Sequence, residues 1–279
     1  MTCAVFANLT RPSAPDVTRA VCEKLAELGI SVVMPEEEPL DVPGAGFAPA
    51  SELCSMCDVV ISIGGDGSII RTAKNAARAG KPVLGINAGH LAFMCGLESD
   101  ELDRLGAIVT GEYKIDRRMI LRAAARTANG VFYEDMCLND VVIRSDAVHM
   151  AYLNVSGSDF EQNHTADGLI FATPTGSTAY SLAAGGPVVE PTLEAIIMTP
   201  ICPHSLTSRS VLLTPDRSFT VKANPSRPGP VFFSCDGNDP VELPPDAGLE
   251  ISRADIFADF IRIKTDSFMD ILARKMQGR

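Results

Sequence analysis

The fold is decided by the stretch Asp58-Val59-Val60-Ile61-Ser62-Ile63-Gly64-Gly65-Asp66-Gly67-Ser68, in which apolar, β-branched residues run into a glycine-rich turn. The apolar run predicts a buried strand, and residues 69–79 after the turn carry apolar side chains at helical spacing. Residues 5–7, 30–34 and 82–86 predict further strands with helical segments between them. Strands that alternate with helices predict a mostly parallel sheet covered by helices.

The second half of the chain has a different texture. From about residue 119, short β-type runs are separated by Pro, Gly, Asn and Asp, and the last residues return to helical spacing. The Pro- and Gly-rich segment 35–49 is expected to be an exposed loop. We therefore predict an α/β first half, a mainly β second half and a final helix.

Composition limits the classes of partner. The 279 residues include 24 Lys and Arg against 35 Asp and Glu, a net charge of −11 that disfavours nucleic acid and anionic membranes. A nucleotide stays possible, because a local basic cluster can reverse the field inside one cleft. No apolar run approaches the roughly 18 residues that span a bilayer. Eight scattered cysteines, mostly in apolar segments, favour reduced thiols and a cytoplasmic protein.

The glycine turn suggests phosphate chemistry. Glycines let the backbone approach a ligand, and the free amides at a helix start bind phosphate oxygens, so we predict phosphate contacts at Gly64, Gly65, Gly67 and Ser68. Asp66 would repel phosphate unless it takes a proton from a hydroxyl or helps to hold a metal, and both roles belong to phosphoryl transfer. Arg71 could reach a phosphate, whereas Lys74 and Arg78 are better explained as a solvated face. A tight turn with a capping aspartate remains the alternative.

The run DGLIFATPTGSTAYSLAAGGP, residues 167–187, concentrates hydroxyl groups around Gly176. These hydroxyls lie on a turn that is expected to lead into a helix from about Thr178, and they suit ribose or amide recognition. A polar turn with a Ser or Thr cap would explain residues 175–178 but not the rest of the run. The hydroxyl residues are Thr173, Thr175, Ser177, Thr178, Tyr180 and Ser181.

These two segments resemble the NAD kinase family, whose members carry a GGDG turn and a DG…TPTGSTAYS…GGP signature. Residues 87–94 resemble the family's NxGxLGF segment, Asn139-Asp140 its Asn-Glu/Asp pair, and residues 233–238 a segment near its end. The resemblance therefore covers most of the chain in order. The chain departs from the family pattern at three positions, which are Ser68 for Thr, Ala92 for Gly and Thr165 for a basic residue.

The resemblance implies an α/β plus β architecture with a Rossmann-like N-terminal domain, residues 1–116. Residues 117–265 would form a β-rich NAD-binding domain, and the helix 266–279 would return to the first domain. The implied reaction transfers the γ-phosphoryl group of ATP to the 2′-hydroxyl of the adenosine ribose of NAD, with Asp66 as the catalytic residue. A divalent ion, Mg²⁺ or Mn²⁺, would assist, with no metal ligand assigned among the protein side chains, and the protein would be a homo-oligomer, a dimer or tetramer.

The resemblance also assigns residues to the dinucleotide. They are Gly67, Arg71, Phe93, Asn139, Asp140, Asp167, Thr178, Ala179, Tyr180, Ser181, Leu182, Ala183 and Asn238.

Two other functions are weighed against this one. Lipid and sphingoid kinases share the GGDG turn, but the chain has no basic amphipathic helix suited to a membrane surface. A nucleotide-binding regulator without catalysis is disfavoured because Asp66, Asn139 and Asp140 are intact. Cys54-Ser55-Met56-Cys57 has the spacing of a zinc knuckle, but without a second pair a buried structural role is favoured. His90 is assigned no role.

Overall fold

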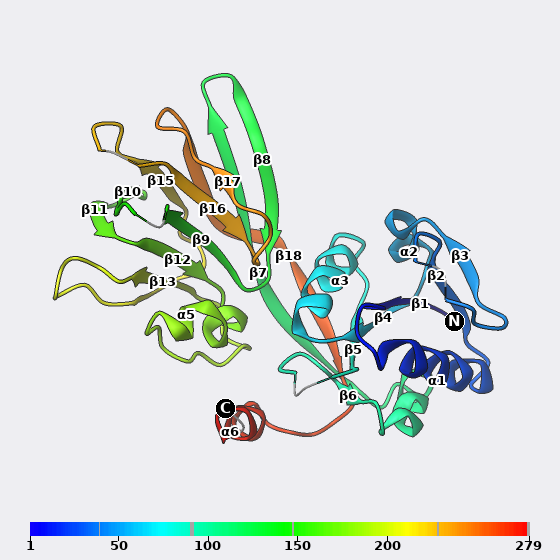
Figure 1. Ribbon diagram of the computed structural model, residues 1–279. Coiled ribbons are helices and arrows are strands. Elements are labelled where there is room, and N and C mark those ends of the chain that lie inside the picture. Colours follow the sequence, from blue (N-terminus) through cyan, green and yellow to red (C-terminus); the bar gives the residue numbers. More distant parts are fainter. Residues whose placement is uncertain (39, 90–91, 147, 228, 278–279) are drawn as a thin grey trace. The chain divides into compact units, whose positions relative to one another are not determined.

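The computed structural model contains two compact units (Figure 1). One unit consists of Met1–Arg117 and Ala258–Arg279, and the other is Arg118–Phe257. The chain returns to the first unit within a single strand, β18 (Gly248–Arg262). In the sequence this strand corresponds to two separate segments of alternating apolar and polar residues, 249–253 and 257–263. The residues that the structure describes are 1–38, 40–89, 92–146, 148–227 and 229–277.

The first unit is built on a parallel sheet with the strand order β3-β2-β1-β4-β5. Its central strands β1 and β4 are paired in parallel over five residues, from Cys3 opposite Val59 to Ala7 opposite Ile63. β6 and the end of β18 pair with β5. The strands are β1 (Thr2–Ala7), β2 (Ser31–Pro35), β3 (Gly46–Ala48), β4 (Val59–Gly64), β5 (Val83–Asn87) and β6 (Leu97–Glu98).

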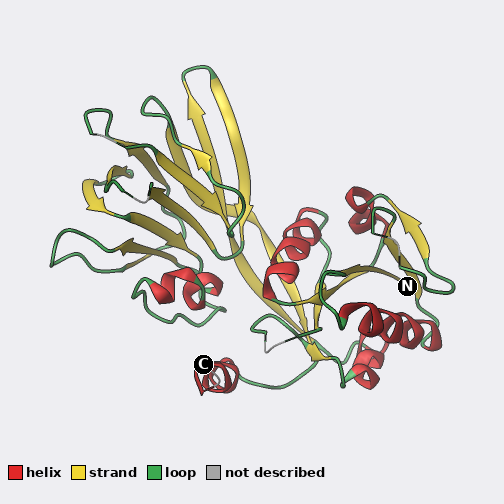
Figure 2. Cartoon of the chain, in the orientation of Figure 1, coloured by secondary structure: helices red, strands yellow, loops and turns green. Residues whose placement is uncertain are grey.

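Helices cover both faces of this sheet, with α2 and α3 over one face and α1 over the other (Figures 1 and 2). α1 begins with a proline in its first turn and is closed by Gly29 at a positive φ of 71°. α3 buries Ile69, Ile70 and Ala73 against the sheet. The helices are α1 (Ala14–Glu27), α2 (Ala50–Met56), α3 (Asp66–Arg78), the 3₁₀ helix η1 (Leu102–Gly106), α4 (Ala107–Thr110) and α6 (Phe268–Gln277).

The second unit is β-rich and contains two packed layers. One layer has the order β14-β13-β12-β9-β16-β17, and the other includes β11-β10-β15-β18 with the hairpin β7-β8. Their facing side chains form one core with Phe171, Phe219 and Phe233 fully buried. The strands are β7 (Lys114–Thr127), β8 (Gly130–Cys137), β9 (Asp140–Ser145), β10 (Ala151–Ser156), β11 (Glu161–Ala166), β12 (Gly168–Ala172), β13 (Ile196–Ile201), β14 (Val211–Leu213), β15 (Phe219–Ala223), β16 (Val231–Cys235) and β17 (Val241–Glu242).

The predicted architecture, α/β followed by β with a final helix, is confirmed, and two local expectations need correction. Segment 35–49 is not a loop throughout, because β3 extends the sheet edge beside β2. The helix expected from about Thr178 is present as the short α5 (Tyr180–Ala183), which follows the 3₁₀ turn η2 (Thr175–Thr178). Lys74 is not on a solvated face, since it is only 7% exposed. Helical spacing predicted which side of α3 carries Lys74. Whether that side is buried depends on tertiary packing, which the spacing does not specify.

The eight cysteines form no disulfide bond; seven of them are buried, and Cys202 is exposed. In the described part of the chain, no helix is both long and apolar enough to span a bilayer.

Candidate functional site

The glycine turn places Asp66 at the first position of α3, immediately after β4. Gly64 is required here because a Cβ would lie 2.9 Å from the Cβ of Ser68. The Nδ2 of Asn8 donates a hydrogen bond of 3.0 Å to the Oγ of Ser68, so the end of β1 is tied to the same turn. The structure therefore joins the carboxyl ends of β1 and β4 around the start of a helix, which is an anion-binding arrangement.

Asp66 is held in a fixed orientation by the loop that follows β5. One carboxylate oxygen accepts a hydrogen bond from the amide of Phe93 and the other from the amide of Met94, each at 3.0 Å. Phe93, which the sequence assigns to the dinucleotide, is thus tied directly to Asp66. His90 and Leu91 of the same predicted segment lie outside the described residues.

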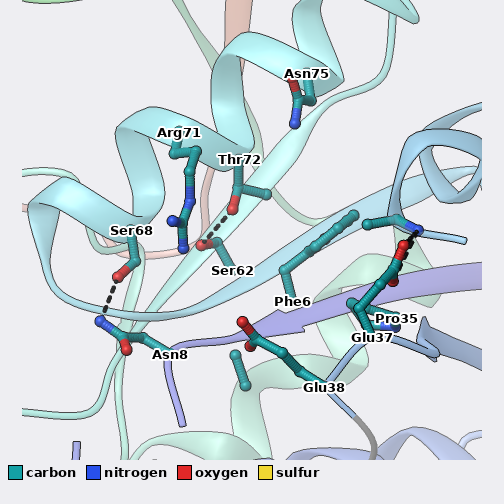
Figure 3. A pocket seen from close by; sticks show the side chains of 12 residues that line it. Phe6, Asn8, Pro35, Glu37, Glu38, Ser62, Ser68, Arg71, Thr72 and Asn75 are labelled. Atoms are coloured by element: carbon teal, nitrogen blue, oxygen red, sulfur yellow. Dashed lines mark hydrogen bonds between the residues drawn. The ribbon is translucent and has the colours of Figure 1, made fainter. Parts of the chain in front are cut away.

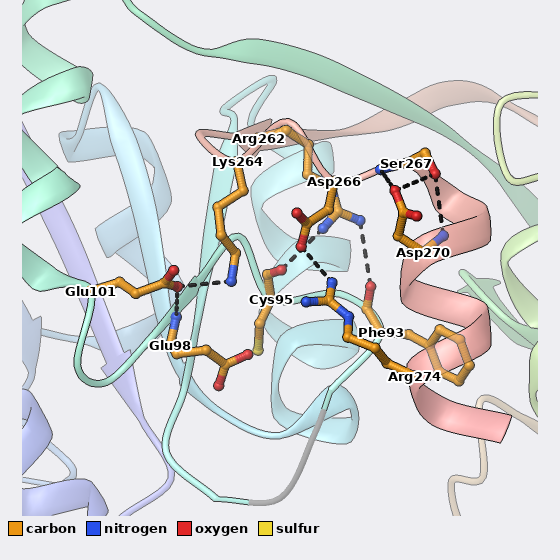
Figure 4. Close-up of polar contacts among 10 residues, drawn as sticks. All are labelled: Phe93, Cys95, Glu98, Glu101, Arg262, Lys264, Asp266, Ser267, Asp270 and Arg274. Carbon is orange, nitrogen blue, oxygen red and sulfur yellow. Dashed lines mark hydrogen bonds and ion pairs between the residues drawn. The ribbon is translucent and has the colours of Figure 1, made fainter. Parts of the chain in front are cut away.

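The loop that orients Asp66 is itself held by the end of β18 (Figure 4). The Arg262 guanidinium donates to the carbonyl of Cys95 at 3.0 Å and forms an ion pair with Asp116 at 3.1 Å. Both charged side chains are only 16% exposed, so the pair is shielded from solvent.

Arg11 is a site residue that the sequence analysis missed. Its guanidinium lies against two glycine backbones, because a Cβ on Gly65 would be 2.7 Å from its Nη2 and one on Gly89 would be 2.4 Å from its Nη1. This places a cation beside the glycine turn.

Arg71 lies one turn into α3, where the spacing predicted it. Its side chain is exposed and lines a cavity of about 300 Å³ together with Ser68 and Asn8 (Figure 3). The first unit therefore contains two cations, Arg11 and Arg71, together with the backbone of the glycine turn. These groups can attract phosphate.

In the second unit, Asn139 and Asp140 are positioned by Asp236, another residue that the sequence analysis did not single out. Its carboxylate accepts hydrogen bonds from the amides of Leu138, Asn139 and Asp140 at 2.8, 2.7 and 3.1 Å. Asp236 has a positive φ of 51°, a conformation that Asp and Asn tolerate better than most residues. The Oδ1 of Asn139 is buried and has no hydrogen-bond partner within the described chain, so it is available to a donor on a ligand.

Asp140 is a strongly perturbed carboxyl group. Only 5% of the residue is exposed. Burial, and to a smaller extent the charge of Asp236, raises the pKa of Asp140 from 3.8 to about 7. A carboxyl group with this pKa can donate or accept a hydrogen bond near neutral pH, and perturbed groups of this kind concentrate at functional sites.

The hydroxyl-rich run 173–181 packs against the Asn139 segment. Gly176 must be glycine because a Cβ would lie 2.1 Å from the carbonyl oxygen of Asn139. Most of the hydroxyls are buried and bonded internally. Thr173 donates to Leu138, and the Oγ of Ser177 accepts from the amide of Val189 and donates to its carbonyl.

Two further hydroxyls are occupied within the unit. Ser181 is bonded to Thr199, and Thr175 accepts from Arg118. The hydroxyl pattern thus builds the turn, and among the six only Thr178 and Tyr180 are partly exposed.

The remaining predicted residues do not all gather at Asn139. Asp167 is exposed and lies at the opposite end of β12 from Ala172, which pairs with Asp140. Five strand residues at about 3.4 Å each separate Asp167 from the turn by about 17 Å. Asn238 is exposed and donates to Asp135 at 3.3 Å. Ala179 lies between η2 and α5, and Leu182 and Ala183 follow Tyr180 within α5.

Within the described ranges, no group of three or more His, Cys, Asp or Glu residues has a metal-binding arrangement. Cys54 and Cys57 are 5% and 3% exposed, and burial raises the pKa of the Cys54 thiol to about 11. Protonated, buried thiols are structural.

A parallel sheet with a cationic glycine turn, accompanied by a β-rich unit with acid and amide groups, defines a nucleotide-binding protein. Family comparison gives a specific result. The ATP-NAD kinase N-terminal domain matches residues 50–113, and the ATP-NAD kinase C-terminal domain matches residues 138–263.

Full-length relatives agree with these matches. The NAD kinase of Symbiobacterium thermophilum is 38% identical, over 99% of this chain and 98% of that protein. The NAD kinase of Desulforamulus reducens is 35% identical, over 99% and 97%. The chain belongs to the NAD kinase family.

Solved structures share the fold. A yeast NADH kinase complexed with NADH superposes with a TM-score of 0.88 at 22% identity, over 99% of this chain and 87% of that one. An NAD kinase from Archaeoglobus fulgidus in complex with ATP has a TM-score of 0.75 at 24% identity, over all of both chains.

Proposed function

We propose that this protein transfers the γ-phosphoryl group of ATP to the 2′-hydroxyl of the adenosine ribose of NAD, giving NADP. The main support for this proposal is the orientation of the Asp66 carboxylate in the glycine turn. Its two oxygens accept hydrogen bonds from the amides of Phe93 and Met94. The full-length relatives named NAD kinase support the same reaction.

Asp66 would orient the 2′-hydroxyl and accept its proton as the new oxygen–phosphorus bond forms. An aspartate is a weak base toward an alcohol, so much of the rate is expected from positioning and from neutralising charge on the phosphates. The groups available for this are Arg11, Arg71 and the turn at Gly64, Gly65, Gly67 and Ser68. The hydrogen bonds to Asp66 fix its carboxylate before substrate arrives, which reduces reorganisation during the reaction.

The dinucleotide would be recognised by hydrogen-bonding groups. The unpartnered Oδ1 of Asn139 can accept from a hydroxyl or amide, and Asp140 can do so in its ionised form. Tyr180 offers a partly exposed ring for stacking. Because the hydroxyl of Ser181 is bonded to Thr199, Ser181 would contribute through its backbone. Gly67, Phe93, Asp167, Thr178, Ala179, Leu182, Ala183 and Asn238 complete the proposed set.

A divalent ion, Mg²⁺ or Mn²⁺, would accompany ATP. The described residues hold no ready-made cluster of protein ligands, so the chemistry fits an ion bound mainly by phosphate oxygens. Bound in this way, the ion would neutralise charge on the transferring group.

The test is to incubate the purified protein with ATP, Mg²⁺ and NAD and to measure NADP with a coupled NADP-specific dehydrogenase. We expect NADP to accumulate in proportion to enzyme and not when ATP is omitted. Diacylglycerol and sphingosine serve as alternative acceptors. An absence of NADP at every protein concentration would overturn the proposal.

We further propose that the protein works in the cytoplasm as a homo-oligomer, a dimer or tetramer. The free thiols are compatible with a reducing compartment. Light scattering coupled to size-exclusion chromatography would give the mass in solution, and a monomeric mass at micromolar concentration would contradict the oligomer.

A further inference from the structure

The cavity that Arg71 lines occupies a particular place in the parallel sheet. Its walls come from the carboxyl-terminal parts of β1, β2 and β4, from the start of α2 and from the first three turns of α3. β2 and β4 flank β1, so the strand order reverses there. Crevices at such a reversal, outside the carboxyl ends of the strands, are where open α/β sheets bind nucleotides.

One side of the cavity suits phosphate. Asn8 and Ser68, joined by their hydrogen bond, lie at this side, and the Arg71 guanidinium extends beside them (Figure 3). The glycine turn that contains Asp66 immediately precedes Ser68 in the chain. A phosphate chain here would therefore lead toward the proposed reaction centre.

The other side carries the acidic residues that follow β2. Glu37 is occupied, since its carboxylate accepts from the amide of Ala50 at 3.0 and 3.1 Å. Glu38 is exposed, and its carboxylate extends into the cavity (Figure 3). Carboxylates repel phosphate but accept hydrogen bonds from ribose hydroxyls, and an acidic residue after the second strand has this role in dinucleotide-binding β-α-β units.

The walls between these two sides are partly apolar. Phe6, Pro35 and Ala50 line them, and a flat ring can pack on such surfaces. The cavity volume of about 300 Å³ lies at the lower end of the usual range for ligand pockets. That volume matches a nucleoside better than a complete dinucleotide.

We propose that this cavity binds the nucleoside of the phosphoryl donor, with its ribose at Glu38 and its phosphates directed toward Ser68 and Arg71. The proposal rests on the proposed function, because it names the donor of that reaction as a nucleoside triphosphate. An inorganic polyphosphate would use only the phosphate side of the cavity.

The test uses two substitutions that act on the nucleoside side alone. Ala50→Trp fills the cavity from the start of α2, and Glu38→Gln removes the charged acceptor. The matched control is Glu36→Gln, because Glu36 is exposed in the same acidic run but does not line the cavity. Thermal melting of each variant reports on folding.

Two binding measurements separate the sides of the cavity. We expect Ala50→Trp to raise the Kd for ADP, measured by calorimetry, and the KM for ATP by about tenfold or more. Glu38→Gln should raise the same two constants by about three- to tenfold. The inhibition constant of inorganic tripolyphosphate and the KM for NAD should change less than about twofold, as should every constant of Glu36→Gln.

Unchanged ADP binding in both folded variants, or an equal loss of tripolyphosphate binding, would overturn the proposal. If Ala50→Trp fails to fold, Glu38→Gln decides. Failure of the proposed function is distinguishable, because ADP binding needs no acceptor. Weakened ADP binding in variants of a protein that forms no NADP would support the cavity assignment and reject the reaction.

Discussion

Asp66 in the first unit and Asp236 in the second have the same local geometry but different surroundings. Each carboxylate accepts hydrogen bonds from consecutive backbone amides of a distant loop, two for Asp66 and three for Asp236. Asp66 begins a thirteen-residue helix with the cation Arg11 near its turn. Asp236 instead faces a buried acid, Asp140, in a left-handed turn.

This difference indicates that an aspartate can organise a loop without being a catalytic residue. A helix start with nearby cations attracts phosphate, whereas an acid beside another acid repels phosphate and favours hydroxyl or amide ligands. Asp66 combines loop organisation with a place where phosphate can bind. Asp236 is expected only to position its neighbours.

The largest expected effect is on turnover in Asp66→Asn. An asparagine has one oxygen acceptor, so it can satisfy only one of the amides of Phe93 and Met94, and it cannot take a proton. We expect turnover to fall at least about a hundredfold, with NAD affinity weakened less than about tenfold. Steady-state NADP formation and calorimetric NAD binding measure the two quantities. Wild-type turnover would show that Asp66 only organises the loop.

Asp236→Ala should be the reverse case, because it removes the acceptor of three amides without touching the reaction. We expect a loss of at least about 2 kcal/mol in the free energy of unfolding, measured with urea. NAD affinity should fall more than turnover at saturating NAD. Asp236→Asn is the matched control, since it keeps the positive φ and part of the acceptor. If Asp236→Ala lowered turnover more than Asp66→Asn does, the distinction between the two aspartates would be wrong.

Asp140 should give the unliganded protein a pH-dependent stability. Its folded pKa, about 7, exceeds the ordinary 3.8, so folding favours the protonated form. The resulting stabilisation is complete below about pH 4 and is lost as pH rises through 7. Between pH 5 and 8, wild type should lose about 2 to 3 kcal/mol relative to Asp140→Asn in urea unfolding. Parallel pH profiles would contradict this assignment.

The smallest effect on stability is expected for Gly65→Ala. Its new Cβ would meet the guanidinium of Arg11, a flexible side chain that can move, so the unfolding free energy should change by less than about 1 kcal/mol. The KM for ATP should rise severalfold because Arg11 is displaced. In Gly176→Ala the obstacle is the carbonyl of Asn139, so this control should be much less stable in thermal melting. Equal stability losses would contradict the distinction.

The sequence predicted one part of each region and missed another. Glycines beside an aspartate mark a turn whatever the fold, so Asp66 was identified from its neighbours. Asp236 was missed because its importance comes from amides 96 to 98 residues away in the chain. Arg11 was missed for the same reason, since only folding brings it against Gly65.

The order of the elements, the glycine turn at Asp66 and the family could all be predicted from the sequence. These are local properties, because spacing, backbone freedom and motif identity are read from neighbouring residues. Only the tertiary structure decided that the hydroxyls of residues 173–181 mostly build a turn, that Asp140 has a raised pKa and that Glu38 shares a cavity with Arg71. Burial and hydrogen-bond partners depend on residues far apart in the chain, so no local pattern specifies them.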